Sequence, residues 1–327
     1  MAIYGGIDLG GTKIQAIVLD SEAQEAGRVL GQARHQTPHS GGPRAVAKEI
    51  EASLREAAAQ AGVELERLAG IGVGSPGEVD AQMGTVAHAG NLPDWEAPFA
   101  LAQELSGALG GVPVSLGNDV GVATRAELEL GAGQGARSLL GVFWGTGVGG
   151  GLVFDGELWR GRGAAGEIGH MVVKLGGARC PCGRRGCVEA YAGRRAMEAK
   201  ARRQQRKGHK TDLFEIMREK GHEELSSGVW AHALEHGDEL AQKLIERAVG
   251  ALGAGIASAV NLLDIELIVL GGGLGTRFGE QMAGRIAAAM HPHLFNDERP
   301  PQLRVAALGD LGGAIGAAML CGPVASS

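Results

Sequence analysis

One pattern occurs twice along the chain: an apolar stretch, a glycine-rich turn and a second apolar stretch. It is found first over residues 3–19 and again over residues 139–154. Two short apolar segments joined by a glycine turn predict the two strands of a hairpin. A layout that recurs within one chain predicts an internal duplication. We therefore expect two copies of one structural unit.

Strand and helix patterns alternate after each hairpin. Further strands are expected over residues 68–73, 112–116, 265–270 and 303–308. Apolar residues at helical spacing predict a helix over 43–61, and other helices are expected at 98–109, 120–130, 276–290 and 311–320, with a helix-rich stretch over 188–263. This alternation predicts an α/β fold whose largely parallel or mixed sheet is covered by helices.

Glycine is unusually abundant, with 57 among 327 residues. The glycines do not recur at every third position, which excludes collagen, and 44% apolar residues argue against a disordered chain. The excess therefore predicts turns and places where the backbone approaches another group closely. A chain of this length suggests roughly two domains.

The charge and the chain start exclude several classes of protein. A net charge of −6 argues against a broad nucleic-acid surface. The first residues reach Asp8 without a basic region or a long apolar core, so no signal peptide is expected. The uncharged run over residues 138–154 is rich in glycine and too short to span a bilayer comfortably. The sequence predicts a cytoplasmic protein without a membrane partner.

The first glycine turn has the composition of a phosphate site. Glycines let backbone N–H groups point at a phosphate, Thr12 adds a hydroxyl and Lys13 adds a charge. A carboxylate just before the turn suits a hydrated Mg²⁺. The residues are Asp8, Gly10, Gly11, Thr12 and Lys13. A plain hairpin turn is the alternative.

Two later glycine runs extend this pattern. Gly145, Gly147 and Gly150 match G-x-G-x-x-G, but the run leads into an apolar strand, whereas a dinucleotide fingerprint opens a helix. An NAD-dependent oxidoreductase is therefore a weak alternative. The run from Gly271 to Gly275 lies between a strand and a helix, a place where a nucleotide can lie against the backbone.

Three cysteines within eight positions predict a metal site. Together with His170 they form the Cys₃His set of a closed, structural zinc site: Cys180, Cys182 and Cys187. The alternative is three unliganded thiols. Such a zinc loop would also hold Glu167, His170 and Glu189 near one another, and two carboxylates with an imidazole suit the hydroxyls of a sugar. Cys321 is predicted to be a packing residue.

Asn118 and Asp119 follow the strand predicted at 112–116. A carboxylate at the end of a strand can take the proton from an attacking hydroxyl. Taken alone, the pair could be only a turn or a helix cap.

Together these motifs resemble the ROK family of sugar kinases, repressors and related proteins. The most specific part is Glu167 to His170 followed by Cys180 to Glu189, and the likeness runs from Asp8 to the last helix. Within the family it is greatest to bacterial glucokinases. The resemblance implies an actin-like (ribonuclease H-like) duplicated fold with two domains around a cleft: a small one over 1–120 plus 309–327 and a large one over 121–308.

The resemblance also implies an activity, ATP-dependent phosphorylation of the 6-hydroxyl of glucose, with Mg²⁺ beside the nucleotide. Asp119 would be the catalytic base. The sugar would be held by Asn118, Asp119, Glu167, His170, Glu189 and, at its edge, Asn91 with the Ser75–Gly77 loop. The phosphates would meet Gly11, Thr12, Lys13, Thr146 and Gly147, and adenosine would lie against Gly272 and Gly273. A homodimer or homotetramer is expected.

Several alternatives stay open within this hypothesis. Another hexose, such as mannose or an N-acetylhexosamine, could be the substrate. The Lys- and Arg-rich stretch from Arg194 to Lys210 could serve polyphosphate as donor, although a solvated helix face is the favoured interpretation. A sugar-responsive repressor needs a DNA-binding segment before the phosphate motif, and only seven residues precede Asp8.

Overall fold

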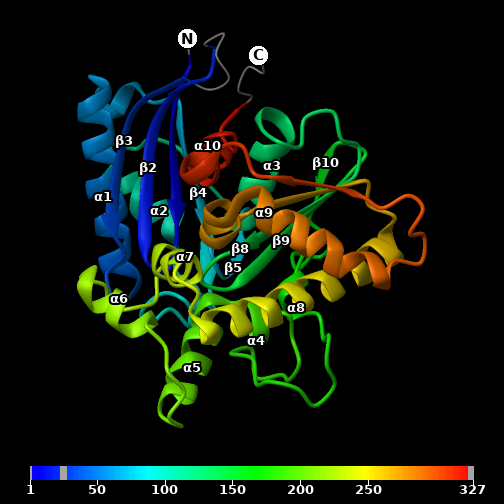
Figure 1. Cartoon of the computed structure of the whole chain (residues 1–327). Helices are drawn as coiled ribbons and strands as arrows, with labels where there is room; N and C mark the ends of the chain where they lie inside the picture. Colours follow the sequence, from blue (N-terminus) through cyan, green and yellow to red (C-terminus); the bar gives the residue numbers. More distant parts are fainter. Residues whose placement is uncertain (1, 23–27, 323–327) are drawn as a thin grey trace. The chain divides into compact units, whose positions relative to one another are not determined.

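A computed structural model describes residues 2–22 and 28–322 of the chain (Figure 1). The chain forms two compact units. The first comprises residues 1–135, 161–163 and 307–327, and the second comprises residues 136–160 and 164–306. Each unit is built around its own sheet and its own buried core.

In the described part of the first unit, five strands form a mixed sheet in the order β3-β2-β1-β4-β7. β1 pairs antiparallel with β2, and β2 with β3, whereas β1, β4 and β7 run parallel. The strands are β1 (Ile3–Leu9), β2 (Lys13–Asp20), β3 (Arg28–Gln36), β4 (Gly70–Ser75) and β7 (Val114–Asn118). A separate hairpin joins β5 (Glu78–Asp80) to β6 (Thr85–Ala87).

The described part of the second unit repeats this sheet, in the order β10-β9-β8-β11-β12. Its first three strands are again antiparallel, and β8, β11 and β12 are parallel. The strands are β8 (Leu139–Trp144), β9 (Val148–Phe154), β10 (Glu157–Trp159), β11 (Leu267–Gly271) and β12 (Gln302–Val305).

The identical strand order and direction confirm the predicted duplication and the α/β class. Both predicted hairpins are present, as β1–β2 and β8–β9. The sequence interpretation missed the third strand of each unit, β3 and β10. β3 alternates exposed and buried residues at a sheet edge, and β10 has only three residues. Such strands carry little apolar signal.

Helices cover both faces of the first sheet. The side chains of β2 alternate between the faces, since Ile14 and Val18 pack in the cluster with α1 (Gly42–Ala61) and Ile17 packs with α10 (Gly312–Ala318). In Figure 1, α1 (blue) and α10 (red) accordingly flank the strands. The remaining elements are α2 (Leu101–Ala108), α3 (Asp119–Leu130), η1 (Leu65–Arg67) and η4 (Gly309–Leu311).

Two paired strand glycines bring α10 close to the sheet. Gly6 of β1 lies opposite Gly72 of β4. A Cβ at Gly6 would lie 2.1 Å from the carbonyl oxygen of Ala314, and one at Gly72 would lie 1.7 Å from that of Ala317. No side chain fits at those distances. Part of the glycine excess therefore serves the approach of helix to sheet.

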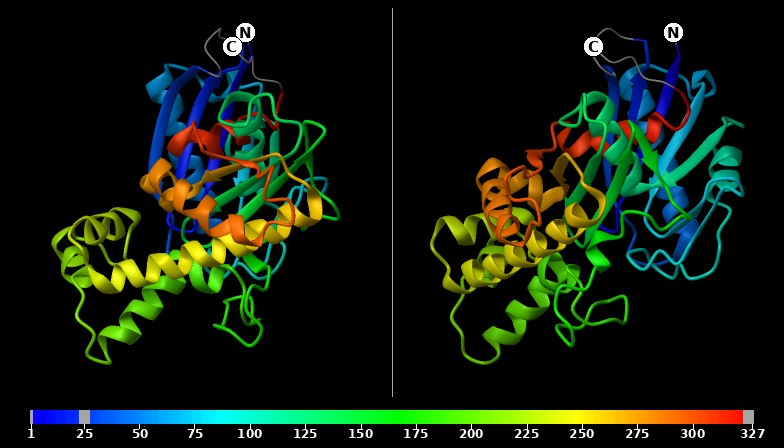
Figure 2. Two further views of the ribbon diagram at one scale, coloured as in Figure 1. Left: turned by 45° about the vertical axis from the view of Figure 1, so that its right-hand side comes forward. Right: turned by 90° about the vertical axis from the view of Figure 1, so that its right-hand side faces the viewer.

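The second unit carries the helix-rich segment predicted for 188–263. Its longest helix, α8 (Glu239–Leu263), packs beside α9 (Gly272–Met290), as Figure 2 shows in yellow and orange. The other elements are α4 (Glu189–Ala192), α5 (Arg194–Gln205), α6 (Leu213–Glu219), α7 (Ser227–Glu235), η2 (Ile168–His170) and η3 (His291–His293). Within residues 2–22 and 28–322, no helix is long and apolar enough to cross a membrane.

A histidine between two carboxylates joins β3 to α1. His35 Nδ1 lies 2.5 Å from Glu49 Oε1, and its Nε2 lies 3.0 Å from Glu56 Oε2. The hydrogen bonds to Glu49 and Glu56 raise the pKa of His35 above its usual 6.5. The fold therefore favours the imidazolium. This stabilisation is fully present below about pH 6.5 and is lost as the pH rises through the folded-state pKa.

We expect His35→Gln to lower the melting temperature more at about pH 6 than at about pH 9. Melting curves of both proteins across that range measure the difference. The same substitution at exposed His39 is the control and should give a difference that does not change with pH. A His35→Gln effect that is equal at both ends of the range would contradict this assignment.

Candidate active site

Three polar residues of the first unit lie at one edge of its sheet. β1, β4 and β7 are parallel, and their register pairs Asp8 with Gly74 and Ser75 with Asn118. The carboxyl ends of parallel strands meet at a common edge, where ligands bind in open α/β sheets. Asp8, Ser75 and Asn118 are therefore brought together, as the sequence hypothesis requires.

Asn118 and Asp119 form the junction between β7 and α3. The side-chain oxygen of Asn118 accepts a hydrogen bond of 3.0 Å from the Gly121 amide, so Asn118 is the N-cap. Its amide nitrogen remains the part suited to donate to a sugar hydroxyl. Asp119 Oδ1 accepts a hydrogen bond of 2.8 Å from the Val120 amide. Asp119 thus stands in the first turn of α3.

The first glycine turn is held rigidly by hydrogen bonds. The Gly10 amide donates to the Lys13 carbonyl over 2.9 Å, and the Thr37 hydroxyl donates to the Gly10 carbonyl over 2.6 Å. A Cβ at Gly11 would lie 2.8 Å from the carbonyl oxygen of Asn91. The predicted phosphate turn and the predicted sugar-edge residue Asn91 are therefore neighbours within the first unit.

Lys13 and Asp8 lie in a set of charges completed by the segment before α10. Lys13 Nζ is 3.3 Å from Asp310 Oδ1, and Arg34 also pairs with that carboxylate. Burial raises the pKa of Asp8. The charge of Lys13 partly offsets this rise, and the charge of Asp310 adds to it. Burial also acts to raise the pKa of Asp310, but hydrogen bonding to Arg34 and the charge of Lys13 outweigh it and lower the pKa. Lys13 is thus held at the turn by an ion pair.

The two glycine-rich runs of the second unit are adjacent. β8 and β11 are parallel and end together, since Gly271 pairs with Phe143. A Cβ at Gly145 would lie 3.6 Å from the backbone nitrogen of Gly273. Gly272 has a φ of 78°, and a Cβ there would lie 2.6 Å from the Trp144 carbonyl oxygen, so only glycine fits. The predicted phosphate turn and the glycines predicted to meet adenosine therefore lie at one edge, although Gly272 to Gly275 form the start of α9 and not a loop before it.

The run from Gly145 to Gly151 forms the turn between the antiparallel strands β8 and β9 and continues into β9 itself. A dinucleotide fingerprint requires a helix after the glycines. The structure thus removes the context on which the NAD alternative depends.

Glu189 connects the second glycine turn, Gly145–Gly147, to the cysteine loop. Its Oε2 accepts a hydrogen bond of 3.0 Å from the Val148 amide, and a Cβ at Gly147 would lie 2.3 Å from the same oxygen. Its Oε1 lies 3.8 Å from Cys180 Sγ. Glu189, a predicted sugar ligand, therefore contacts both the second glycine turn and the thiols.

The predicted metal ligands of the second unit converge. The ligand atoms of four residues all lie within 4.8 Å of one another: His170, Cys180, Cys182 and Cys187. Cys180 Sγ is 3.8 Å from His170 Nδ1, and Cys182 Sγ is 3.8 Å from Cys187 Sγ. A tetrahedral zinc site with bonds of about 2.3 Å separates its ligand atoms by about 3.8 Å. The four residues therefore fit a structural zinc ion.

The two nitrogens of His170 face different partners. Nδ1 faces the thiols, whereas Nε2 lies 3.9 Å from Glu167 Oε2. Burial raises the pKa of Cys180. Burial also acts on Cys182, but hydrogen bonds, chiefly from the Arg184 backbone, lower its pKa to about 7. Cys182 is thus the thiol that most readily becomes the thiolate a metal requires.

Arg194 contacts the second glycine turn, Gly145–Gly147, and the sequence interpretation missed this contact. The sequence favours a solvated helix face for the stretch from Arg194 to Lys210, and for Arg194 this prediction is wrong, because its side chain is buried. Its Nη2 donates to Thr146 Oγ1 over 3.1 Å, and its Nη1 donates to the Leu225 carbonyl over 3.0 Å. Glu224 completes an ion pair at 3.3 Å. Nothing in the sequence separates Arg194 from its exposed neighbour Arg195.

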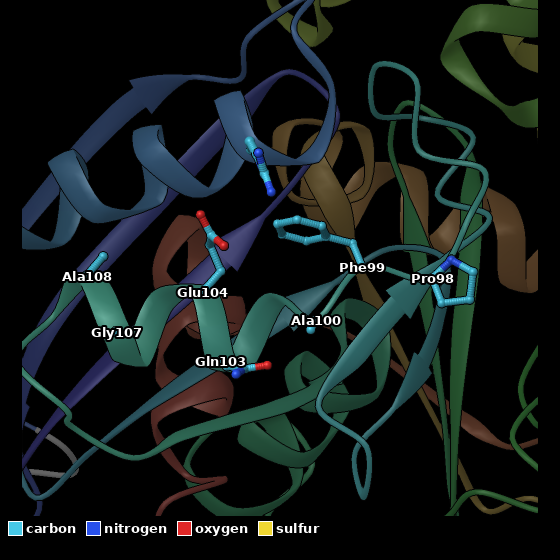
Figure 3. Close-up of a pocket in the computed structure, with 8 residues that line it drawn as sticks. Pro98, Phe99, Ala100, Gln103, Glu104, Gly107 and Ala108 are labelled. Atoms are coloured by element: carbon cyan, nitrogen blue, oxygen red, sulfur yellow. The ribbon is translucent and has the colours of Figure 1, made fainter.

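A pocket of about 650 Å³ opens beside α2 in the first unit (Figure 3). Phe99, Gln103 and Glu104 are among the residues that line it, and none of the predicted site residues does. This pocket is therefore not part of the candidate site.

The comparison with known families agrees with this geometry. A family model described as ROK family matches residues 4–323, nearly the whole chain. The chain belongs to the ROK family. One curated ROK relative, glucokinase of Thermotoga maritima, is 32% identical over 280 residues, which cover 85% of this chain and 84% of the relative.

Two solved ROK structures are similar over almost their full length. The ROK hexokinase from Thermus thermophilus is 35% identical, with a TM-score of 0.74 and 97% of each chain covered. A ROK glucokinase from Streptomyces griseus, in complex with glucose and AMPPNP, is 31% identical, with a TM-score of 0.82, and covers 98% of this chain and 99% of its own. The fold is thus the actin-like fold of ROK sugar kinases, as the resemblance implied.

Proposed function

We propose that the protein is an ATP-dependent glucokinase, which transfers the γ-phosphoryl group of ATP to the 6-hydroxyl of glucose. The observation that carries the proposal is the similarity over 98% of the chain to a glucokinase that binds glucose and AMPPNP. The site supports it, because the predicted base and the glycine turns lie at the ends of the expected strands, and Glu189 contacts both the second of these turns and the thiol cluster.

The first unit would supply the base and part of the sugar site. Asp119 would accept the proton of the 6-hydroxyl while the oxygen of that hydroxyl forms a bond to the γ-phosphorus. The bond from that phosphorus to the β-phosphate oxygen breaks, and ADP leaves with the electron pair. Such transfer depends on positioning and charge neutralisation more than on covalent chemistry. Asn118 would hold the sugar through its amide, with Asn91 beside it.

Both glycine turns would meet the nucleotide phosphates. Backbone amides at Gly10–Lys13 and Gly145–Gly147 can approach phosphate oxygens because no side chain intervenes. Gly272 and Gly273 would lie against adenosine. Mg²⁺ bound near the phosphates would neutralise charge, and Asp8 is the carboxylate suited to its hydration shell.

The cysteine cluster would hold a structural zinc ion and position the sugar ligands. Zinc on His170 Nδ1 would fix the ring so that Nε2 is directed to a sugar hydroxyl. Glu167 and Glu189 would accept hydrogen bonds from other hydroxyls. A ligand whose orientation depends on an anchored neighbour loses affinity when the anchor is removed. Zinc is therefore expected to affect sugar binding without taking part in phosphoryl transfer.

The proposed function is tested by a coupled ADP-release assay with a panel of hexoses. Glucose should give the highest kcat/KM, ahead of mannose and the N-acetylhexosamines. The assay is repeated with polyphosphate as donor and sugar phosphate as readout, and ATP should be much better. Higher kcat/KM with another hexose, or equal turnover with polyphosphate, would correct the substrate or the donor. No turnover with any of them would overturn the proposal.

Arg194 is expected to position the second glycine turn, Gly145–Gly147, for ATP. Arg194→Met removes a hydrogen bond to Thr146 and a charge paired with Glu224, so we expect the KM for ATP to rise about tenfold or more. The KM for glucose should change much less. Initial-rate kinetics with each substrate varied in turn separate the two effects.

Arg195→Met is the matched control, because the Arg195 side chain is 44% exposed. It should leave both constants near the wild-type values, and Arg194→Lys should restore part of the ATP affinity. Equal changes in both KM values for Arg194→Met, or the same loss in the control, would show that Arg194 acts only through folding.

The working context follows from this activity. Because ATP is the donor, we place the reaction in the cytoplasm. We also propose a homodimer or homotetramer, in line with the resemblance, and light scattering of the purified protein tests it.

A further inference from the structure

The last turn of α7 brings together two imidazoles and a carboxylate that have no place in the proposed kinase reaction. His232, Glu235 and His236 stand at positions i, i+3 and i+4, which share one face of a helix. Their ligand atoms all lie within 4.8 Å of one another, and the two rings have centroids 4.2 Å apart. Two histidines four residues apart on a helix are a recurrent zinc-binding arrangement.

The hydrogen bonding of His236 prepares it as a ligand. Its Nδ1 lies 2.9 Å from the carbonyl oxygen of His232. A carbonyl only accepts, so Nδ1 carries the proton and Nε2 keeps the lone pair that a metal ion needs. Metal-binding histidines commonly donate their second ring nitrogen in this way, which fixes the tautomer and the ring orientation.

The electrostatics of this turn favour a cation. The carboxyl end of a helix carries the negative end of its dipole. Glu235 adds a carboxylate, while the two imidazoles bind as neutral ligands. Imidazole nitrogens select Zn²⁺, Ni²⁺ or Cu²⁺, whereas Mg²⁺ prefers a shell of oxygen ligands. The Mg²⁺ that accompanies ATP would therefore compete poorly here.

Exposure distinguishes this set from the cysteine cluster. Glu235 and His236 are exposed and His232 is half-buried, whereas Cys180 and Cys187 are buried. The exposed side chain of Glu235 can rotate to bring its carboxylate closer to the imidazoles, and three protein ligands leave at least one position for water. An ion here would be accessible and exchangeable.

From these observations we propose that His232, Glu235 and His236 form a second, exchangeable site for a transition-metal ion of the zinc, nickel and copper class. Binding would fix the last turn of α7, a helix that packs against α6, α8 and α9. An ion held only by the folded helix stabilises the folded state. This inference does not depend on the proposed kinase activity.

The test uses Ni²⁺ on the full-length protein after loading with zinc, so that the cysteine cluster is occupied. Equilibrium dialysis should show one additional Ni²⁺ per chain, and Ni²⁺ should raise the melting temperature. His236→Ala should weaken Ni²⁺ binding by more than about 100-fold. Removing a group that only hydrogen-bonds to a metal ligand lowers metal affinity by about 10- to 100-fold, and removing the ligand itself should cost more. The exposed position of His236 makes its substitution safe for folding.

His222→Ala is the control, since His222 is an exposed histidine of the same unit outside the cluster. It should bind Ni²⁺ as the wild type does. Co²⁺ bound at the α7 site should show a spectrum without thiolate charge transfer. Ni²⁺ binding that persists undiminished in His236→Ala and in His232→Ala, or no additional Ni²⁺ in the wild type, would overturn the proposal.

Discussion

Asp119→Asn is expected to lower the turnover number by about two to four orders of magnitude, the range that a positioned general base contributes. The asparagine oxygen can still accept the hydrogen bond from the Val120 amide, so the start of α3 should keep its structure. What the variant loses is the ability to take the proton of the attacking hydroxyl. The affinity for glucose should therefore stay within a few-fold of wild type.

Steady-state kinetics give the turnover number, and calorimetry gives the glucose affinity. Asn118→Ser provides a contrast, because serine also caps a helix while it lacks the amide that would donate to the sugar. That variant should lose glucose affinity first. If Asp119→Asn turns over at the wild-type rate, Asp119 is not the base.

Cys182→Ser is expected to remove zinc and glucose affinity together. Cys182 Sγ lies 3.8 Å from Cys187 Sγ, and a serine oxygen is a much poorer zinc ligand than a thiolate. Without the ion, His170 and the cysteine segment that leads into Glu189 lose their common anchor. We expect glucose to bind about 10- to 100-fold more weakly, as for the loss of groups that orient ligands.

Zinc is measured by elemental analysis and glucose affinity by calorimetry on the same preparations. Cys321→Ser is the control, since that thiol lies in the first unit, where burial raises its pKa to about 11. It should keep both zinc and affinity. A zinc-free Cys182→Ser protein that binds glucose normally would disprove the coupling.

Much of the architecture could be predicted because apolar strands and glycine turns leave a strong pattern. The hairpins and the duplication are predicted and observed, and so is a strand-to-helix junction in the Gly271–Gly275 run, although α9 begins at Gly272 and not at Thr276. β3 and β10 were missed because edge strands bury little apolar surface. The paired glycines Gly6 and Gly72 were unexplained until the structure showed α10 packed against them.

Some features of the candidate site could likewise be predicted from the sequence, and others could not. The convergence of three cysteines with His170 could be predicted, because ligand type and spacing are visible in sequence. Arg194 could not, since its burial and its bond to Thr146 depend on how α5 meets the glycine turn. The hydrogen bond from Val148 to Glu189 is likewise a tertiary contact without a sequence signal.

The central claim is tested most directly by measuring ADP and glucose 6-phosphate in one reaction of the purified protein with ATP, Mg²⁺ and glucose. The account predicts that the two products form in equal amounts and that neither accumulates without glucose. ADP released regardless of glucose, or ADP without a phosphorylated sugar, would contradict it.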